Sequence, residues 1–319
     1  MRYKKSLSQL LVLILTLSIG IAIPQKAAYA DALKSVTLGA DLTNSQKEDM
    51  LKYFEVTRKE ANVLEVTNAE EAKYLAKIAS EQQIGSRAIS CSYVEPTKKG
   101  GLQISTNNIN WVTESMIKNA LITAGVENAI VKVSAPFNVS GTAALTGILK
   151  GFEKSDGGTK IDENKKEAAN QELVVTGDLG DKIGQDEAAK LINEIKKDVV
   201  KEKPKTDEDI RKIVVNVTNN YSSLKDKLSD EDIQAIINLM KKINSLDLDF
   251  KKIKDQLNDV SKSLKEKLGS EEAQGFFAKV KEFFVNLIDS IKNFFSINTD
   301  VDSKLAYNDI RCEVFTSYF

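Results

Sequence analysis

The 319-residue sequence contains no histidine, and this decides most of the chemistry that it can carry. Ser-His-Asp and Cys-His hydrolase sites and His-ligated metal centres all need an imidazole, so the sequence excludes them. The two cysteines, Cys91 and Cys312, are too few for a thiolate zinc site. Acidic residues are plentiful, but no pair stands at a strand end as carboxylate catalysis would require. We therefore expect neither a metal nor a cofactor.

Ser115 and Lys118 match S-x-x-K, the nucleophile motif of penicillin-recognising enzymes. The same spacing recurs at Ser222 and Lys225, and the K-T-G and S-D-N partner motifs are missing from the sequence. Chance matches are expected in a lysine-rich chain. The motif leaves one alternative open, a histidine-free envelope-acting hydrolase that uses Ser, Thr or carboxylates. The segment from Gly177 to Gly180 lacks the spacing of a phosphate-binding loop and is expected to be a turn.

A second group of polar and small residues forms the candidate binding site, and its members either converge in one pocket or scatter across turns. Gly141 comes directly after a strand and begins a run of small residues, so we expect the backbone there to pass close under the sheet or a ligand. A helix beginning at this point would offer free N–H groups to an anion, although tight helix-on-sheet packing is the favoured explanation. The candidate residues are Asp41, Asn107, Asn108, Ser140, Gly141 and Thr142.

The hydrophobic pattern of residues 31–200 predicts strands that alternate with helices. Pro136 is expected to end the last strand, and the double glycine at 100–101 is expected to turn a β-hairpin. Strands are predicted at 36–39, 63–67 and 129–135, the hairpin at 86–94 and 102–105, and helices at 43–54, 68–79, 113–124, 141–152, 163–173 and 185–200.

The second half of the chain is helical by period. Residues 201–206 are charged and contain Pro204, which indicates a linker between two domains. A heptad-like seam from Leu246 to Leu268 is typical of a helical hairpin or a short coiled coil. The fold class is therefore α+β: a mixed α/β domain with a small sheet at 31–200, followed by an all-helical hairpin or bundle domain at 207–296. Residues 297–319 lose both the period and the lysine richness and form an atypical tail.

Residues 276–295 place six phenylalanines on one stripe of an amphipathic helix. Such a stripe must be covered. The favoured interpretation is that the hairpins at 210–268 cover it. The alternative is contact with a membrane surface or a partner helix through Phe276–Phe295.

Residues 1–30 have the parts of a cleavable signal peptide: a basic start, an apolar stretch from Leu10 to Ile23, and an Ala28-Tyr29-Ala30 cleavage site. We expect cleavage after Ala30 and a secreted protein, either free or associated with the cell wall. Cleavage removes four of the 45 basic residues and none of the 46 acidic ones, which argues against nucleic acid as a partner. A buried Cys91 is favoured over a bridge to Cys312, which stays open.

Several stretches resemble the YpuA-like family, and they cover roughly residues 35–200. They are 38–43, 84–90, 107–109, 119–125 and 135–147, of which the last is the most specific. Members of that family are exported proteins of Gram-positive bacteria with a domain of unknown function. The resemblance implies secretion and a shared α/β unit, and it transfers no catalytic residues. The leading hypothesis is an exported, non-enzymatic binding or structural protein whose partner is a component of the cell wall or envelope.

Overall fold

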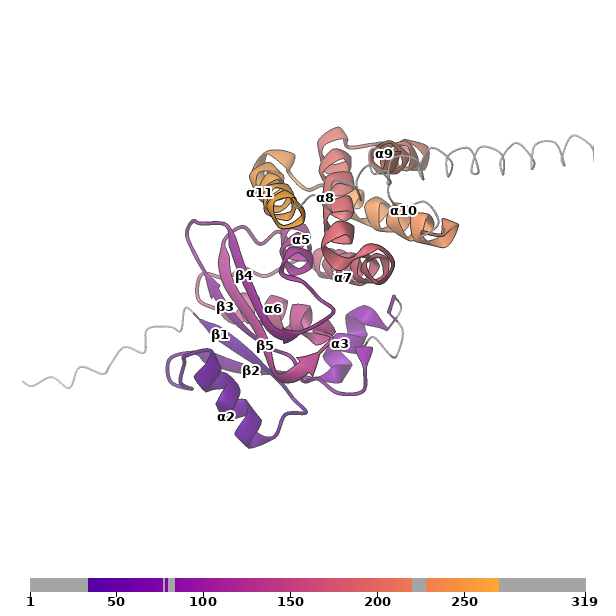
Figure 1. The fold of residues 1–319 in the computed structure, drawn as a ribbon. Helices are drawn as coiled ribbons and strands as arrows, with labels where there is room; N and C mark the ends of the chain where they lie inside the picture. The colour runs from indigo at the N-terminus through magenta and orange to yellow at the C-terminus, as the bar shows by residue number, and fades with distance from the viewer. Residues whose placement is uncertain (1–33, 77, 80–83, 220–227, 270–319) are drawn as a thin grey trace, which may run out of the picture.

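The computed structural model describes residues 34–76, 78–79, 84–219 and 228–269. The expected signal peptide, the stripe Phe276–Phe295 and Cys312 therefore lie outside the described residues. Within them, the first half of the chain forms a five-stranded mixed sheet with helices on both faces, and the second half is helical (Figure 1). This confirms the α+β class.

The sheet has the strand order β2-β1-β3-β5-β4. Four of its strands run in the same direction, and β3 runs against them. The strands are β1 (Ser35–Gly39), β2 (Asn62–Val66), β3 (Cys91–Pro96), β4 (Leu102–Ile109) and β5 (Ala129–Val139). The carboxyl ends of β1, β2, β4 and β5 therefore meet at one edge of the sheet.

The expected hairpin of β3 and β4 is wrong, because β5 lies between them. Ser134 of β5 is opposite Cys91 on one side and opposite Asn107 on the other. The burial pattern explains this order. Val131 and Val133 of β5 are buried as befits an inner strand, whereas β4 carries exposed polar residues that suit the edge of a sheet.

The expected end of the strand at Pro136 is also wrong, since β5 continues to Val139. Pairing with β3 stops at Ser134, so Pro136 lacks a β3 neighbour and its missing N–H breaks no bond in that ladder. On the β4 side, the register shifts between Asn107 and Ile109. Asn108 sits at this shift with a φ of +56°.

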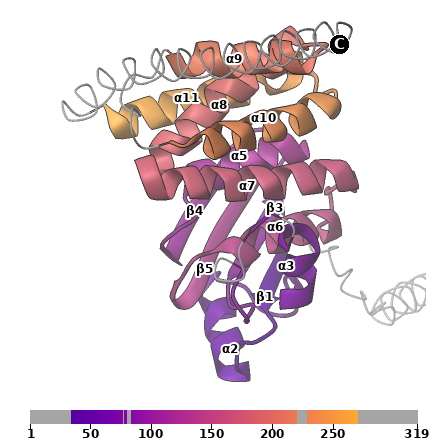
Figure 2. The same cartoon turned by 90° about the vertical axis from the view of Figure 1, so that its right-hand side faces the viewer.

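Helices cover both faces of the sheet (Figures 1 and 2). Helix α2 (Asn44–Tyr53) covers one face, where its Met50 packs in a core with Leu38 and Tyr93. Helices α5 (Glu114–Ala124) and α6 (Thr142–Lys154) cover the other face, and α3 (Asn68–Leu75) packs beside α6. Gly147 lets α6 approach the sheet closely, because a Cβ there would lie 2.6 Å from Thr37 Oγ1.

Helix α7 (Glu163–Ile183) is longer than the sequence predicted, and the expected turn at Gly177–Gly180 is wrong because these residues are helical. Gly177 lies under the ring of Trp111, and a Cβ at this position would come within 2.2 Å of the ring. Glycine here serves close packing and not a turn.

The remaining helices are α8 (Gln185–Glu202), α9 (Asp207–Asn219), α10 (Asp230–Ser245) and α11 (Phe250–Leu268). They lie beyond α5 and α7 as a second helical layer (Figure 2). The apolar seams of α9, α10 and α11 pack on α5, α7 and α8. All these helices share one continuous core with the face of the sheet that α5 covers. No helix in the described part of the chain is long and apolar enough to cross a membrane.

Candidate functional site

The sequence-predicted site residues all lie at the carboxyl edge of the parallel strands. Asp41 follows β1, Asn107 and Asn108 end β4, and Ser140 to Thr142 join β5 to α6. The helices that follow these strands begin at the same edge. In open α/β sheets this edge is where ligands usually bind.

At this edge, however, the polar side chains are engaged in local hydrogen bonds. Asp41 Oδ2 accepts a hydrogen bond from the Ala88 N–H at 2.7 Å. The Asn108 side-chain amide donates to the Ala135 carbonyl at 2.8 Å, and Ser134 Oγ donates to Asn107 Oδ1 at 3.4 Å. These bonds fasten neighbouring loops and strands to one another.

Position 141, directly before α6, requires a glycine because of its backbone conformation and its close surroundings. Its φ is +93°, and a Cβ would lie 2.4 Å from Ile109 Cγ2. A side chain here would therefore meet both strain and a steric clash. The Ser140 and Thr142 hydroxyls on either side of it lie 3.4 Å apart.

The structure adds Glu71 of α3, which sequence reasoning missed. Its side chain is fully buried, and neither carboxylate oxygen has a hydrogen-bond partner of normal geometry in the described part of the chain, although the Thr142 side chain is close enough to act on it. Burial raises the pKa of Glu71 to about 7, and the Thr142 hydroxyl opposes this rise. A signal was present in the sequence: Glu71 lies one helical turn before the buried Leu75, on the face turned to the core.

A hollow of about 210 Å³ opens between α3, α6 and α7. Thr146 lines this hollow, and its buried Oγ1 has no hydrogen-bond partner among the residues that the structure describes. Thr146 lies one helical turn after Thr142, the neighbour of Glu71. The lining residues are Glu70, Lys73, Tyr74, Thr146, Leu149, Lys150, Glu153 and Lys166.

The charges around this hollow hold one another in place. The Lys166 ammonium lies 2.9 Å from carboxylate oxygens of Glu153 and Glu163, and Lys73 donates to Glu163 at 3.0 Å. Lys150 bonds Glu70 and also donates to the Glu65 carbonyl at 2.7 Å.

The protonation states of these groups follow from the same contacts. The Lys166 and Lys73 hydrogen bonds lower the pKa of Glu163 to about 2. Burial works against the charge on Lys166, but the bonds to Glu153 and Glu163 outweigh it and raise the pKa of Lys166. Glu163 and Lys166 thus stay charged at neutral pH, and they belong to a fixed array of alternating lysine and glutamate side chains.

The S-x-x-K pair lies on α5, and its lysine is already occupied. The Lys118 ammonium forms an ion pair with Asp259 of α11, and Ser115 and Lys118 both line a hollow of about 380 Å³ beside the edge strand β4. This ion pair ties α5 to α11 and holds the lysine of the S-x-x-K match in a contact with another helix.

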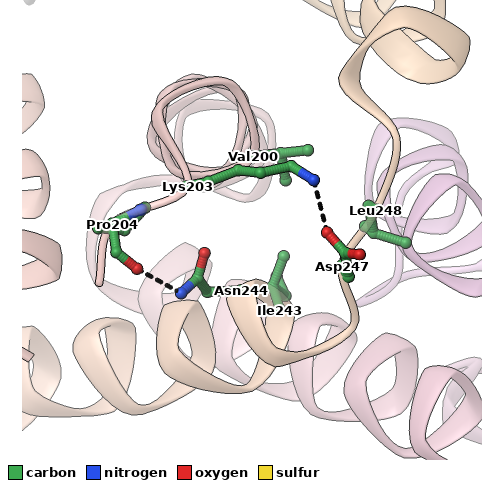
Figure 3. A pocket seen from close by; sticks show the side chains of 7 residues that line it. All are labelled: Val200, Lys203, Pro204, Ile243, Asn244, Asp247 and Leu248. Carbon is green, nitrogen blue, oxygen red and sulfur yellow. Dashed lines mark hydrogen bonds and ion pairs between the residues drawn. The ribbon is translucent and has the colours of Figure 1, made fainter. Parts of the chain in front are cut away.

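A smaller hollow of about 150 Å³ lies where the α8–α9 and α10–α11 corners meet (Figure 3). Lys203 and Asp247 are both left-handed, with φ of +49° and +46°, and their charged groups lie 2.5 Å apart. The Asn244 amide donates to the Pro204 carbonyl at 2.9 Å. These bonds tie the two corners together, so we interpret the residues around this hollow as structural and not as a binding site.

Cysteine and metal chemistry add nothing within the described residues. Cys91 is buried and is a free thiol within the described residues, and burial raises its pKa to about 11, which makes it a poor nucleophile. No group of three potential His, Cys, Asp or Glu ligands comes together in that part of the chain.

The fold and the site define an α+β protein with a charged hollow at the flank of a mixed sheet, and the sequence comparisons place it in a family. Residues 38–260 match DUF1002, a protein family of unknown function, and the chain belongs to this family. It is 41% identical over 271 residues to the uncharacterized protein YpuA of Bacillus subtilis (strain 168). The aligned region covers 84% of this chain and 91% of the relative. The expected YpuA-like family is thus confirmed. No solved structure matches the chain.

Proposed function

We propose that this chain is an exported, non-enzymatic binding protein of the bacterial cell envelope. Export is supported by the basic start, the apolar stretch and the Ala28-Tyr29-Ala30 cleavage site at the N-terminus. The Bacillus subtilis relative supports a Gram-positive source. The partner is then a component that the protein meets outside the membrane.

The observation that carries a binding function is the charged array around the α3–α6–α7 hollow. Ammonium groups of Lys73, Lys150 and Lys166 alternate there with carboxylates that hold them in position. Side chains fixed in this way lose little further entropy when a ligand binds. Thr146 Oγ1, which is buried and has no partner within the described residues, offers a hydrogen bond from the wall of the hollow.

The chemistry of the array selects the class of ligand. A ligand with only carboxylates would meet Glu70 and Glu153, and one with only ammonium groups would meet the lysines. A small ligand that carries both charges, such as an amino acid or a short peptide, can place each against its opposite. We therefore infer a zwitterionic peptide-like ligand, in keeping with a wall or envelope component.

Calorimetry with the mature chain tests this function. L-alanyl-L-alanine is the probe, and its N-acetylated, C-amidated form, which lacks both charges, is the control ligand. We expect saturable binding of the free dipeptide alone, and an affinity about tenfold weaker for Lys73→Gln, since one charge-assisted hydrogen bond is lost. Lys254→Gln changes an exposed lysine on α11 and should leave the affinity unchanged. Equal binding of both ligands, or of neither, would contradict the proposal.

A further inference from the structure

We propose that a proton on Glu71 controls the docking of α3 on α6, so that α3 is closed when Glu71 is neutral and opens when Glu71 is ionised. Helix α3 supplies Glu70, Lys73 and Tyr74 to the wall of the hollow. Docking of α3 therefore completes the hollow. The consequence for ligand binding rests on the proposed function, whereas the docking equilibrium itself does not.

The argument begins with the surroundings of the Glu71 carboxyl. The side chain is 0% exposed, and among the described residues neither of its oxygens has a hydrogen-bond partner of normal geometry. An ionised carboxylate buried in this way loses its hydration without replacement, which strongly disfavours the closed state. A neutral carboxyl avoids most of that penalty.

The charged groups packed around α3 do not compensate Glu71, because they are engaged with one another. Lys150 of α6 bonds Glu70, and Lys166 of α7 bonds Glu153 and Glu163. On α3 itself, the Lys73 ammonium and the Tyr74 hydroxyl both donate to Glu163. Arg87, in the segment that accepts a hydrogen bond from Asn68, is exposed.

Two influences favour the ionised form, and burial outweighs them. Thr142 is the first residue of α6, so its hydroxyl and the positive end of the helix dipole both lie near the carboxyl. The net effect is still a pKa raised from 4.5 to about 7, with burial as the largest cause.

The sign of the pH effect follows directly. When α3 is open, Glu71 is in water and ionises with an ordinary pKa, whereas in the closed state it keeps its proton up to about pH 7. Opening therefore becomes easier as the pH rises from about 4.5 to about 7, and levels off above that. Between pH 5 and pH 8 the opening constant should rise by between roughly tenfold and a hundredfold.

Hydrogen exchange of the full mature chain measures this opening. The protection factors of the α3 amides, corrected for intrinsic exchange rates, are compared at pH 5 and pH 8. We expect the wild type to lose roughly tenfold to a hundredfold of protection in α3 at pH 8, with no matching change in α10. Glu71→Gln, a neutral side chain of the same shape, should keep its protection at both pH values. Glu127→Gln removes an exposed carboxylate and should behave like the wild type.

A second measurement does not depend on any variant. The side-chain carboxyl carbon of Glu71 is followed by NMR during a pH titration of the wild-type protein. A midpoint more than a unit above that of exposed glutamates supports the proton-controlled docking, and an ordinary midpoint overturns it. Equal protection of wild-type α3 at pH 5 and pH 8 also overturns it.

Ligand binding separates this inference from the proposed function. If L-alanyl-L-alanine binds in the hollow, its affinity should fall from pH 5 to pH 8 in the wild type and stay constant in Glu71→Gln. If the dipeptide fails to bind at either pH while α3 still opens with rising pH, the ligand assignment fails and the docking equilibrium stands. If binding is independent of pH and the protection of α3 is constant, the ligand assignment to the hollow stands and the control of docking by Glu71 is overturned.

Discussion

Lys196 and Glu172 form an ion pair that solvent does not reach. Lys196 Nζ lies 2.7 Å from Glu172 Oε1, and the two side chains are 0% and 1% exposed. Lys196 also donates to the Asn119 carbonyl at 2.9 Å and to Thr123 Oγ1 at 3.2 Å. Burial lowers the pKa of Lys196, and the charge of Glu172 opposes that shift. The pair thus joins α5 and α7, which lie next to the sheet, to α8 of the outer helical layer.

Removing one partner of this pair should be far more harmful than removing both. Lys196→Met leaves the Glu172 charge buried and alone, and we expect a loss of about 3–5 kcal/mol in the free energy of unfolding. Lys196→Met combined with Glu172→Leu should recover most of that loss. Urea denaturation measures both. Lys262→Met, which removes an exposed i,i+4 contact with Glu266 at 3.9 Å, should change stability by less than about 0.5 kcal/mol. A double variant as unstable as the single one would contradict this account.

The sequence identified α8 correctly but not the role of Lys196. The apolar stripe of Ile192, Ile195 and Val199 predicted the helix, and Lys196 lies on the same buried face. A lysine within an apolar stripe signals a buried charge, but its partner Glu172 lies on another helix. Local periodicity finds such helices because it depends on neighbours in the chain. It does not find which helices meet.

The packing of Gly177 under Trp111 gives a second prediction. Gly177→Ala places a methyl group where the indole ring now lies, 2.2 Å from the ideal Cβ position. We expect a loss of about 1–3 kcal/mol by overpacking. Trp111 is the only tryptophan in the chain, so its fluorescence reports the shift of the ring directly. Adding Trp111→Phe should recover part of the loss, because a smaller ring leaves room for the methyl group. Unchanged fluorescence and stability in Gly177→Ala would refute the packing argument.

The order of the strands shows what the sequence could not supply. Alternating residues located all five strands, yet the hairpin of β3 and β4 was wrong. The insertion of β5 depends on pairing between Cys91 and Ser134, which are far apart in the chain. The candidate site shows the same limit: Asp41 and Thr142 could be named from the sequence, whereas the burial of Glu71 beside Thr142 depends on how α3 packs on α6.

The outer helices lead to a prediction about residues 270–319. The sequence suggested that the seams at 210–268 need the phenylalanine stripe as a cover, but these seams pack on α5, α7 and α8. We therefore expect a chain that ends at Gly269 to keep a melting temperature within about 2–4 °C of the mature protein, which corresponds to less than about 1 kcal/mol. Thermal unfolding measures this, with ANS fluorescence as a check on exposed apolar surface. A larger drop, with ANS binding, would restore the covering role of Phe276–Phe295.

Export is tested at the N-terminus of the protein in its natural host. Cleavage after Ala30 predicts that protein recovered from the medium or the wall begins at Asp31. N-terminal sequencing checks this. Replacing Ala28 and Ala30 with bulky residues should block cleavage and retain the longer chain in the membrane. Recovery of the unaltered protein solely as a full-length chain in the membrane would rule out this route.

A crystal structure of the mature chain soaked with L-alanyl-L-alanine tests the central claim most directly. The soak is made at a pH near 5 and at a concentration that calorimetry shows to be saturating. The account predicts electron density for one dipeptide between α3, α6 and α7, with its carboxylate against Lys73 or Lys166 and its ammonium group against Glu70 or Glu153. An empty hollow at saturation, or a dipeptide bound elsewhere on the molecule, would contradict it.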